Sequence, residues 1–211
     1  MKRTNKVEKP SASRDRLIDA AGILMSQHGY LGTSISMVCK ELKIPPTSIY
    51  WHFRSKEDLL VAVMEKGAER FLRRIEKLER QFKAEKKSNT KDVTKAAAKL
   101  LEDDHVFIRF WIHIVLEKRN FSKESMKIIT DLRKKSLTWW EGLLMTFFSP
   151  LGEERAKKMT HEYAAFCRHT INGAVIAKEF DEDVSIIKTF MRVFTLMEAL
   201  RDQLMAERIN I

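Results

Sequence analysis

Residues 45–60 hold the side chains of this 211-residue chain that are best suited to contact another molecule. They read Pro-Pro-Thr-Ser-Ile-Tyr-Trp-His-Phe-Arg-Ser-Lys-Glu-Asp-Leu-Leu. The hydroxyls of Thr47 and Ser48 can donate or accept a hydrogen bond, and the indole of Trp51 can contact a thymine methyl group. The pattern therefore predicts a short helix whose side chains reach base edges in a DNA groove.

The same stretch carries groups suited to the DNA backbone. Tyr50, His52 and Lys56 can bind phosphate oxygens, which positions a protein on DNA without reading its sequence. The alternative is an ordinary helix surface around an aromatic core residue. Because Ile49 and Phe53 are four residues apart, they can anchor one side of the helix and leave the other sides exposed.

Three short helices must position this stretch. The apolar residues after Arg14 recur at steps of three and four, and Gly29 ends that first helix. Thr33 and Ser34 stand where a second helix needs a cap. The prolines at 45 and 46 cannot continue the second helix, but proline is well tolerated in the first turn of a third. This arrangement is a helix-turn-helix, whose last helix can enter a major groove.

The remainder of the chain reads as long helices. Ser55 caps a helix that keeps apolar spacing to about Phe82, and a loop is expected at residues 86–90. Helices are then predicted at about residues 90–103, 105–118, 122–148, 153–180 and 184–207. The expected fold is all-α: a basic arm at residues 1–12, a DNA-binding domain at 13–58, and a larger helical domain at 59–211.

Composition limits the class of partner. The formal net charge of +10 and the pI near 9.6 predict attraction to a polyanion, either nucleic acid or an acidic membrane surface. No secretory signal and no long uncharged apolar run is present, so a cytoplasmic protein is expected. Cys39 and Cys167 fall within apolar patterns and lack Cys-x-x-Cys spacing, which predicts buried free thiols.

Enzyme and metal motifs are missing from the sequence. It contains no phosphate-binding glycine loop, no Gly-x-Ser-x-Gly elbow and no His-Glu-x-x-His. His105 and His113 share a helix face, but Arg109 lies between them and argues against a metal site. We therefore expect neither catalysis nor a metal or cofactor.

The run from Ile49 to Leu60, preceded by Gly29-Tyr30 and Thr33-Ser34, resembles the N-terminal domain of the TetR family of bacterial transcriptional regulators. The resemblance covers about residues 13–62. It implies further DNA contacts from hydroxyls near the second helix. The full predicted DNA-binding set is Thr33, Ser34, Ser36, Pro46, Thr47, Ser48, Tyr50, Trp51, His52 and Lys56.

The turn between the second and third helices departs from the family pattern. Lys43 stands where the family usually has a glycine, and Pro45 stands where it usually has a serine or threonine cap. A helix that ends at this position favours a residue with positive φ. We expect Lys43 to adopt positive φ at some cost in free energy.

The resemblance also implies two functions for the larger domain. The first is a cavity for a small, lipophilic effector, with the candidate lining residues Phe107, Phe110, Trp111, Val115, Trp139, Trp140, Met145 and Phe148. The second is a homodimer interface on the last two helices, with the candidates Phe166, Thr170, Ala174, Phe190, Phe194 and Met197.

The sequence thus predicts a transcriptional regulator, in the form of a repressor. It would bind an inverted-repeat operator in double-stranded DNA as a homodimer and release it when the effector binds. The alternative is a non-enzymatic helical adaptor that binds an acidic membrane surface or a protein partner.

Overall fold

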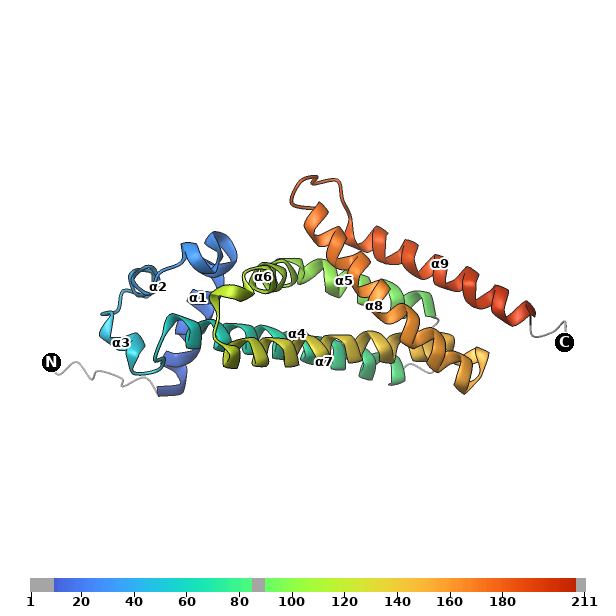
Figure 1. Cartoon of the computed structure of the whole chain (residues 1–211), viewed down its shortest axis with the longest axis horizontal. Helices are drawn as coiled ribbons and strands as arrows, with labels where there is room; N and C mark the ends of the chain where they lie inside the picture. The colour runs from blue at the N-terminus through green and yellow to red at the C-terminus, as the bar shows by residue number, and fades with distance from the viewer. Residues whose placement is uncertain (1–9, 85–89, 208–211) are drawn as a thin grey trace. The chain divides into compact units, whose positions relative to one another are not determined.

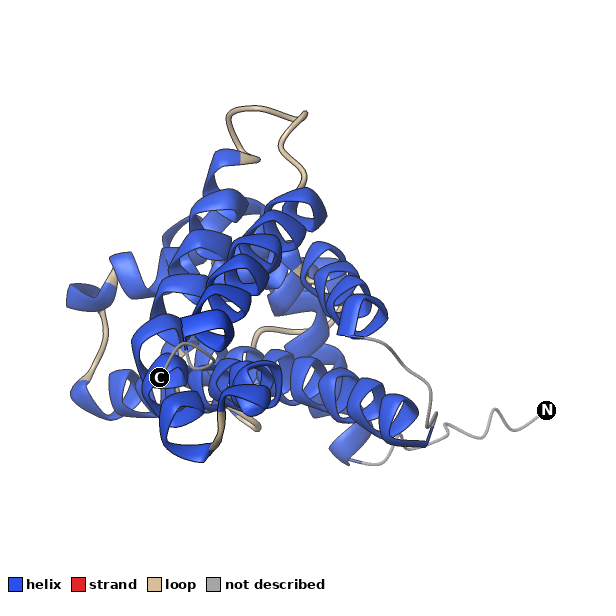
Figure 2. Cartoon of the chain, turned by 90° about the vertical axis from the view of Figure 1, so that its right-hand side faces the viewer, coloured by secondary structure: helices blue, strands red, loops and turns tan. Residues whose placement is uncertain are grey.

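The computed structural model describes residues 10–84 and 90–207, and the regular elements within these ranges are all helices (Figures 1 and 2). The prediction of an all-α fold is therefore confirmed. The α-helices are α1 (Pro10–Gly32), α2 (Ile35–Leu42), α3 (Thr47–Tyr50), α4 (Lys56–Ala84), α5 (Thr90–Asp103), α6 (His105–Leu116), α7 (Lys123–Phe148), α8 (Glu153–Ala177) and α9 (Ile186–Glu207). Two 3-10 turns, η1 (Lys118–Asn120) and η2 (Ser149–Leu151), flank α7. Residues 1–9 of the predicted arm and most of the predicted loop at 86–90 lie outside the described residues.

The chain divides into two compact units. Unit 1 comprises residues 1–69 and 113–129, and unit 2 comprises residues 70–112 and 130–211. The sequence suggested a boundary near residue 58. The difference arises because α4, α6 and α7 each contribute residues to both units, and periodicity within one helix does not tell which of its turns pack together.

Unit 1 surrounds a small core that the apolar spacing of its helices creates. Its buried side chains come from each of the first four helices and from the segment between α3 and α4: Leu17, Ala21, Met25, Val38, Ile49, Phe53, Leu59, Leu60 and Met64. Gly29 interrupts α1 with φ 71° and ψ 169°, a conformation that side-chain-bearing residues rarely adopt. The chain can therefore change direction there, as the sequence predicted.

Hydroxyl caps set the starts of the helices in unit 1. Ser34 Oγ accepts from the Met37 N–H at 3.2 Å at the start of α2. Ser55 Oγ accepts from the Asp58 N–H at 3.0 Å, and Asp58 in turn accepts from the Arg54 N–H at 3.1 Å. Each cap satisfies backbone donors that the first helical turn leaves without partners, so the predicted caps are confirmed.

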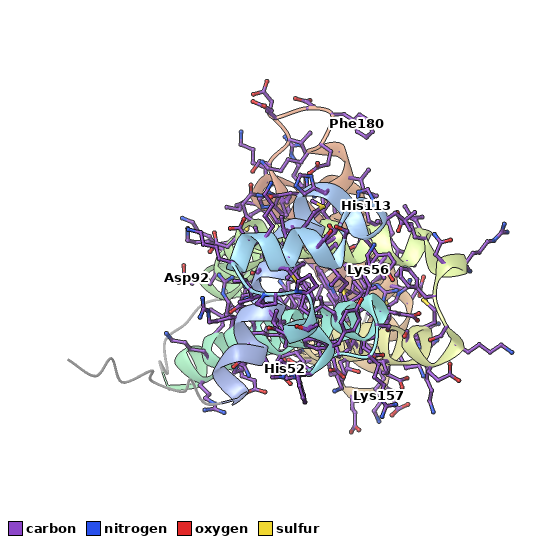
Figure 3. The ribbon with its side chains drawn as sticks, turned by 90° about the vertical axis from the view of Figure 1, so that its left-hand side faces the viewer. His52, Lys56, Asp92, His113, Lys157 and Phe180 are labelled. Carbon is purple, nitrogen blue, oxygen red and sulfur yellow. The ribbon has the colours of Figure 1, made fainter. Side chains whose placement is uncertain are left out.

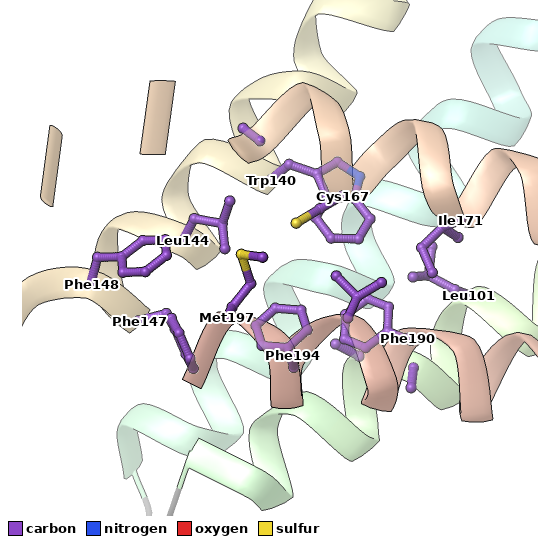
Figure 4. Close-up of a cluster of buried hydrophobic side chains, with 14 of the residues drawn as sticks. Leu101, Trp140, Leu144, Phe147, Phe148, Cys167, Ile171, Phe190, Phe194 and Met197 are labelled. Carbon is purple, nitrogen blue, oxygen red and sulfur yellow. The ribbon is translucent and has the colours of Figure 1, made fainter. Parts of the chain in front are cut away.

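Unit 2 is built around an aromatic cluster (Figure 4). α9 packs along α5 and α8. Phe190 stacks on Phe194 with ring centroids 4.8 Å apart, and Phe147 meets Phe194 edge-on at 5.4 Å. The ring centroids of Trp140 and Phe190 are 5.5 Å apart. Such aromatic contacts stabilise a core beyond the area that they bury.

An ion pair joins α4 to the residue that follows α5. Arg74 Nη1 lies 2.6 Å from Asp104 Oδ2, and Asp104 is only 6% exposed. Burial raises the pKa of Asp104 more than the neighbouring arginines lower it. The short contact with Arg74 therefore offsets only part of the free-energy cost of removing the Asp104 carboxylate from water.

Candidate nucleic-acid interface

The helical turn that begins at the two prolines extends beyond α3 itself. The carbonyls of Pro45 and Pro46 accept from the N–H groups of Ser48 and Ile49, at 3.0 and 3.2 Å. Trp51 keeps helical φ and ψ of −68° and −24° at the other end. Proline has no backbone N–H, but the first N–H groups of a helix have no partner within that helix. The two prolines therefore suit this position.

The turn presents large aromatic groups to solvent. Ile49 is completely buried and Phe53 is 4% exposed, so these two residues anchor the turn. Trp51, by contrast, is 85% exposed and Tyr50 is 60% exposed. Pro46 and Thr47 are also exposed, and Ser48 is half-buried. Adjacent exposed aromatic side chains are typical of a surface that binds another molecule.

The turn that leads to α3 has the strained geometry expected from the sequence. Lys43 has φ 55° and ψ 43°, and no other described non-glycine residue has a positive φ. The Lys43 N–H donates to Lys40 O at 3.2 Å, and the Ile44 N–H donates to Cys39 O at 3.0 Å. These bonds satisfy the last carbonyls of α2 in the way a C-terminal glycine usually allows. The prediction for Lys43 is confirmed.

The hydroxyls at the start of α2 are placed differently from one another. Ser34 and Ser36 are exposed, and their Oγ atoms lie 2.8 Å apart. Thr33 is 1% exposed and its hydroxyl donates to Gly29 O at 2.8 Å. The Thr33 hydroxyl therefore stabilises the end of α1, and its buried side chain has no exposed surface that could contact DNA.

Lys56 is also engaged within unit 1. Its Nζ lies 4.2 Å from the centre of the Tyr30 ring and 3.5 Å from Leu31 O. Burial lowers the pKa of Lys56, while the nearby Glu117 carboxylate raises it. Lys56 and His52 are labelled in Figure 3. The ammonium thus links the start of α4 to the end of α1, a role that the sequence did not reveal.

His52 lines an open depression of about 430 Å³ in unit 1. Carboxylates dominate its charged lining, which includes Glu57, Asp58, Glu65 and Glu124 together with Arg14. Because carboxylates repel phosphate groups, this depression lies outside the proposed DNA surface.

Glu57 holds the start of α7 from within unit 1. Its Oε1 accepts from the Ser122 N–H at 2.7 Å. Burial raises the pKa of Glu57, but hydrogen bonds from the Ser125 and Ser122 hydroxyls and the Ser122 N–H together outweigh burial and leave that pKa below its ordinary value. The carboxylate acts as a cap for the first turn of a distant helix.

Residues 17–63 match the family described as bacterial regulatory proteins, tetR family. The chain is therefore similar to the TetR family over these residues. The matched residues include α1 from Leu17 to its end, the Lys43 turn and the start of α4. The resemblance seen in the sequence is therefore confirmed.

Individual regulators are also similar to this chain. The fatty acid metabolism regulator protein of Bacillus subtilis is 28% identical over 129 residues, which are 61% of this chain and 64% of that protein. The chain thus matches less than two thirds of the relative's length. A Bacillus subtilis FadR structure in complex with stearoyl-CoA has a TM-score of 0.59 at 20% identity, covering 86% of this chain and 96% of that one. A Saccharomonospora viridis regulator structure in complex with choline has a TM-score of 0.67 at 16% identity, covering 89% and 96%.

The two structural neighbours establish the fold alone, and their ligands differ in charge. Stearoyl-CoA carries phosphates, whereas choline is a cation. These bound molecules therefore do not identify a ligand for this chain, which must be argued from its own side chains.

The predicted effector-pocket residues separate into two groups. Trp140 and Phe148 are buried in the aromatic cluster of unit 2, and Trp139 and Met145 pack against it. On α6, Phe107 and Trp111 meet edge-on at 6.0 Å and are half-buried, while Phe110 is 4% exposed. Val115 belongs to unit 1. Among the candidates in unit 2, Phe107 and Trp111 are the two half-buried residues that lie outside the packed cluster.

The predicted dimer residues likewise differ in exposure. Phe190, Phe194 and Met197 are 1%, 3% and 4% exposed within a single chain, so they have almost no area left to bury against a second copy. Ala174 is 8% exposed. Phe166, by contrast, is 49% exposed, and Thr170 is half-buried with its hydroxyl bonded to Phe166 O.

The sequence interpretation missed two exposed positions on these helices. Leu196 on α9 is 63% exposed. Gly173 is exposed on α8, and a Cβ atom added there would meet nothing within 4 Å. A glycine inside a helix lowers stability. Because no close contact within the chain requires a glycine at position 173, its presence in the sequence could have indicated this exposed position.

Other predicted features can be located in the described ranges. Cys39 and Cys167 are free and buried, as predicted, and burial raises the pKa of Cys167 to about 11. His105 Nδ1 lies 2.6 Å from Glu102 O, and Arg109 pairs with Glu179 at 2.6 Å. Among the residues with described side chains, no group of three potential ligands could hold a metal ion. The described helices include none with the length and apolar character needed to cross a bilayer.

Proposed function

We propose that this chain is a ligand-responsive transcriptional repressor that binds an inverted-repeat operator as a homodimer in the bacterial cytoplasm. The observation that carries the proposal is the exposed turn of Pro46, Thr47, Tyr50 and Trp51, held in place by the buried Ile49. The Trp51 indole, at 85% exposed, is the largest apolar group available to a base edge. The match of residues 17–63 to the TetR family supports a regulator over a membrane or protein adaptor.

We assign different roles to the exposed side chains. Thr47, Ser48 and Trp51 read base edges, while Tyr50 contacts phosphates. His52, which the sequence placed among the phosphate contacts, lines the acidic depression and takes no part in DNA binding. Ser34 and Ser36 add backbone contacts from the start of α2. Thr33 and Lys56 act indirectly, since their polar groups already have partners within unit 1.

An operator-binding assay tests this assignment. Fluorescence anisotropy with the DNA upstream of the protein's own gene should reveal a sequence-selective complex whose affinity falls steeply with salt. Trp51→Ala should weaken the preferred site about ten- to hundredfold and change which sequence is preferred. Tyr50→Phe should weaken all DNA evenly.

Ile23→Ala provides the matched control for lost apolar surface. Ile23 is 59% exposed on α1, outside the proposed surface, so its replacement should leave DNA binding unchanged. Equal effects of Trp51→Ala and Ile23→Ala would contradict the assignment of Trp51. Binding of equal strength to every DNA sequence would contradict an operator-specific regulator.

A homodimer requires an interface, and exposed residues of α8 and α9 favour one there. Phe166, Thr170 and Gly173 recur at steps of four and three, which places them on one helix face. The open space at Gly173 suits the close approach of a partner helix. Leu196 provides apolar surface on α9. The two-fold dimer would present recognition helices about 34–36 Å apart, one DNA turn.

Sedimentation equilibrium tests the interface. Phe166→Arg combined with Leu196→Arg should convert the dimer to a monomer, because each arginine would have to be buried without a partner. Leu116→Arg is the control, since Leu116 is 75% exposed but lies on α6. Dimers that survive the double substitution would place the interface elsewhere.

We further propose that a lipophilic effector releases the operator. The relative named as a fatty acid metabolism regulator and the fold neighbour with bound stearoyl-CoA favour an acyl ligand. The ligand would bind unit 2 and shift the population of conformers, with α4 as the continuous connection between the units. Operator and effector must then weaken each other's binding by the same factor. Effector affinity that is unchanged by saturating operator would contradict this coupling.

A further inference from the structure

Three basic side chains of unit 2 interact electrostatically, and none has a carboxylate partner among the described residues. They are Arg133 on α7 and the adjacent Arg168 and His169 on α8. The Nε atom of Arg168 is buried and has no hydrogen-bond partner among the described residues. Arg168 Nη2 lies 3.2 Å from His169 Nε2. Arg109 of the same unit, by contrast, forms an ion pair, with 2.6 Å between its Nη1 atom and Glu179 Oε2.

The electrostatics of this group are unfavourable in the absence of an anion. Burial lowers the pKa of Arg168, and the positive charge of Arg133 lowers it further. Burial, Arg168 and Arg133 also lower the pKa of His169. His169 is therefore neutral at pH 7, so its Nε2 can accept a hydrogen bond from Arg168 Nη2. The Nε donor of Arg168 still lacks an acceptor among the described residues.

The position of the group relates it to the aromatic cluster. Arg133 stands four and seven residues before Leu137 and Trp140, so the three share one face of α7. Leu137 packs against the cluster and Trp140 is buried within it. On α8, Arg168 directly follows the buried Cys167. The cationic side chains thus stand beside the apolar core of unit 2.

We propose that Arg168 and Arg133 bind the anionic oxygen group, a carboxylate or a phosphate, of an amphiphilic effector. Guanidinium groups match the oxygens of carboxylates and phosphates in paired, charge-assisted hydrogen bonds. His169 is a positioning residue that orients the Arg168 guanidinium. The assignment rests on the proposed function, because it names the charge of the effector that unit 2 would bind.

Ligand binding to the purified full-length protein, in the absence of DNA, tests the proposal. Isothermal titration would compare dodecanoate, dodecanoyl-CoA and the neutral dodecanol. We expect at least one of the two anions to bind about ten- to hundredfold more tightly than dodecanol. Binding of dodecanoate identifies the carboxylate as the recognised group, and binding of dodecanoyl-CoA alone identifies phosphate. Equal affinity for dodecanol and both anions would overturn the anion site.

Three variants locate the site. Arg168→Met should raise the thermal midpoint of the ligand-free protein, because it removes a half-buried cation whose Nε atom has no hydrogen-bond partner among the described residues, and it should abolish the preference for the anion. Arg133→Gln should also reduce that preference, and since Arg133 is exposed its replacement should not disturb folding. Lys158→Met, on the exposed side of α8, is the control and should bind as the wild type does.

The variants also separate the possible failures. A preference for the anion that persists in both Arg168→Met and Arg133→Gln would overturn the assignment to these arginines. The readout needs no operator, so sequence-selective DNA binding with no anion preference would overturn this proposal alone. Anion binding that fails to weaken the operator complex would overturn the proposed release mechanism and leave the anion site standing.

Discussion

Replacement of Lys43 by glycine should stabilise the protein, although it removes a side chain. Lys43 is held at φ 55° and ψ 43° by the bonds that end α2. A side-chain-bearing residue in this left-handed conformation costs about 1–2 kcal/mol. Glycine avoids that cost, but it loses about 0.4–1 kcal/mol more backbone entropy on folding than other residues do. The difference leaves a net gain of about 0.5–1 kcal/mol for Lys43→Gly.

Chemical and thermal unfolding would measure this gain. For a chain of this size, about 1 kcal/mol corresponds to a shift of about 2–4 °C in the midpoint. Lys43→Ala keeps the positive φ and removes the same charge, so it should change stability by no more than about 0.5 kcal/mol. Lys40→Gly is the matched control of opposite sign. Lys40 is an exposed helical residue of α2, where glycine should cost about 1 kcal/mol.

The comparison of the two glycine variants decides the outcome. If Lys43→Gly lowered the free energy of unfolding by as much as Lys40→Gly does, the inference of strain at Lys43 would be refuted. A gain of equal size in Lys43→Ala would show that the charge, not the backbone conformation, is responsible.

Three further predictions concern stability. Arg74→Met should lower the free energy of unfolding by about 2–3 kcal/mol at pH 7, because it leaves the buried Asp104 carboxylate unpaired. Burial raises the Asp104 pKa above its ordinary 3.8, so the unfavourable charge appears as pH rises through that pKa, and urea titrations should find a smaller loss in acid. Glu57→Gln should lose about 1 kcal/mol at pH 7 in the same assay. The folded-state pKa of Glu57 lies below 4.5, so its contribution is present above pH 4.5 and is lost as pH falls through the folded-state pKa; a loss that is constant down to pH 2 would contradict this account. Leu144→Ala should cost about 2–5 kcal/mol, since Leu144 is completely buried in the aromatic cluster, and calorimetry would detect a smaller value as evidence of a loosely packed core.

The sequence by itself determined the local features of this protein. Helical periodicity located the helices, and the hydroxyls of Ser34 and Ser55 marked two of their starts. The prolines at 45 and 46 marked the start of the recognition turn, and the lysine at position 43 had to take a glycine-like conformation. These features depend on hydrogen bonds and sterics within a few residues, so neighbouring sequence suffices to predict them.

The tertiary structure alone decided which side chains remain available to a partner. Thr33 and Lys56 are polar residues at promising positions, yet contacts with Gly29, Tyr30 and Leu31 occupy them. On α9, apolar residues occur on more than one side, and only packing against α5 and α8 buries Phe194 while it leaves Leu196 exposed.

Arg168 has no carboxylate partner in the described ranges for the same reason. Its neighbours come from α7 and α8, and the sequence does not state which charges of two long helices will meet. Contacts between residues far apart in the chain follow from how whole helix faces fit together, and a single helix pattern does not contain that information.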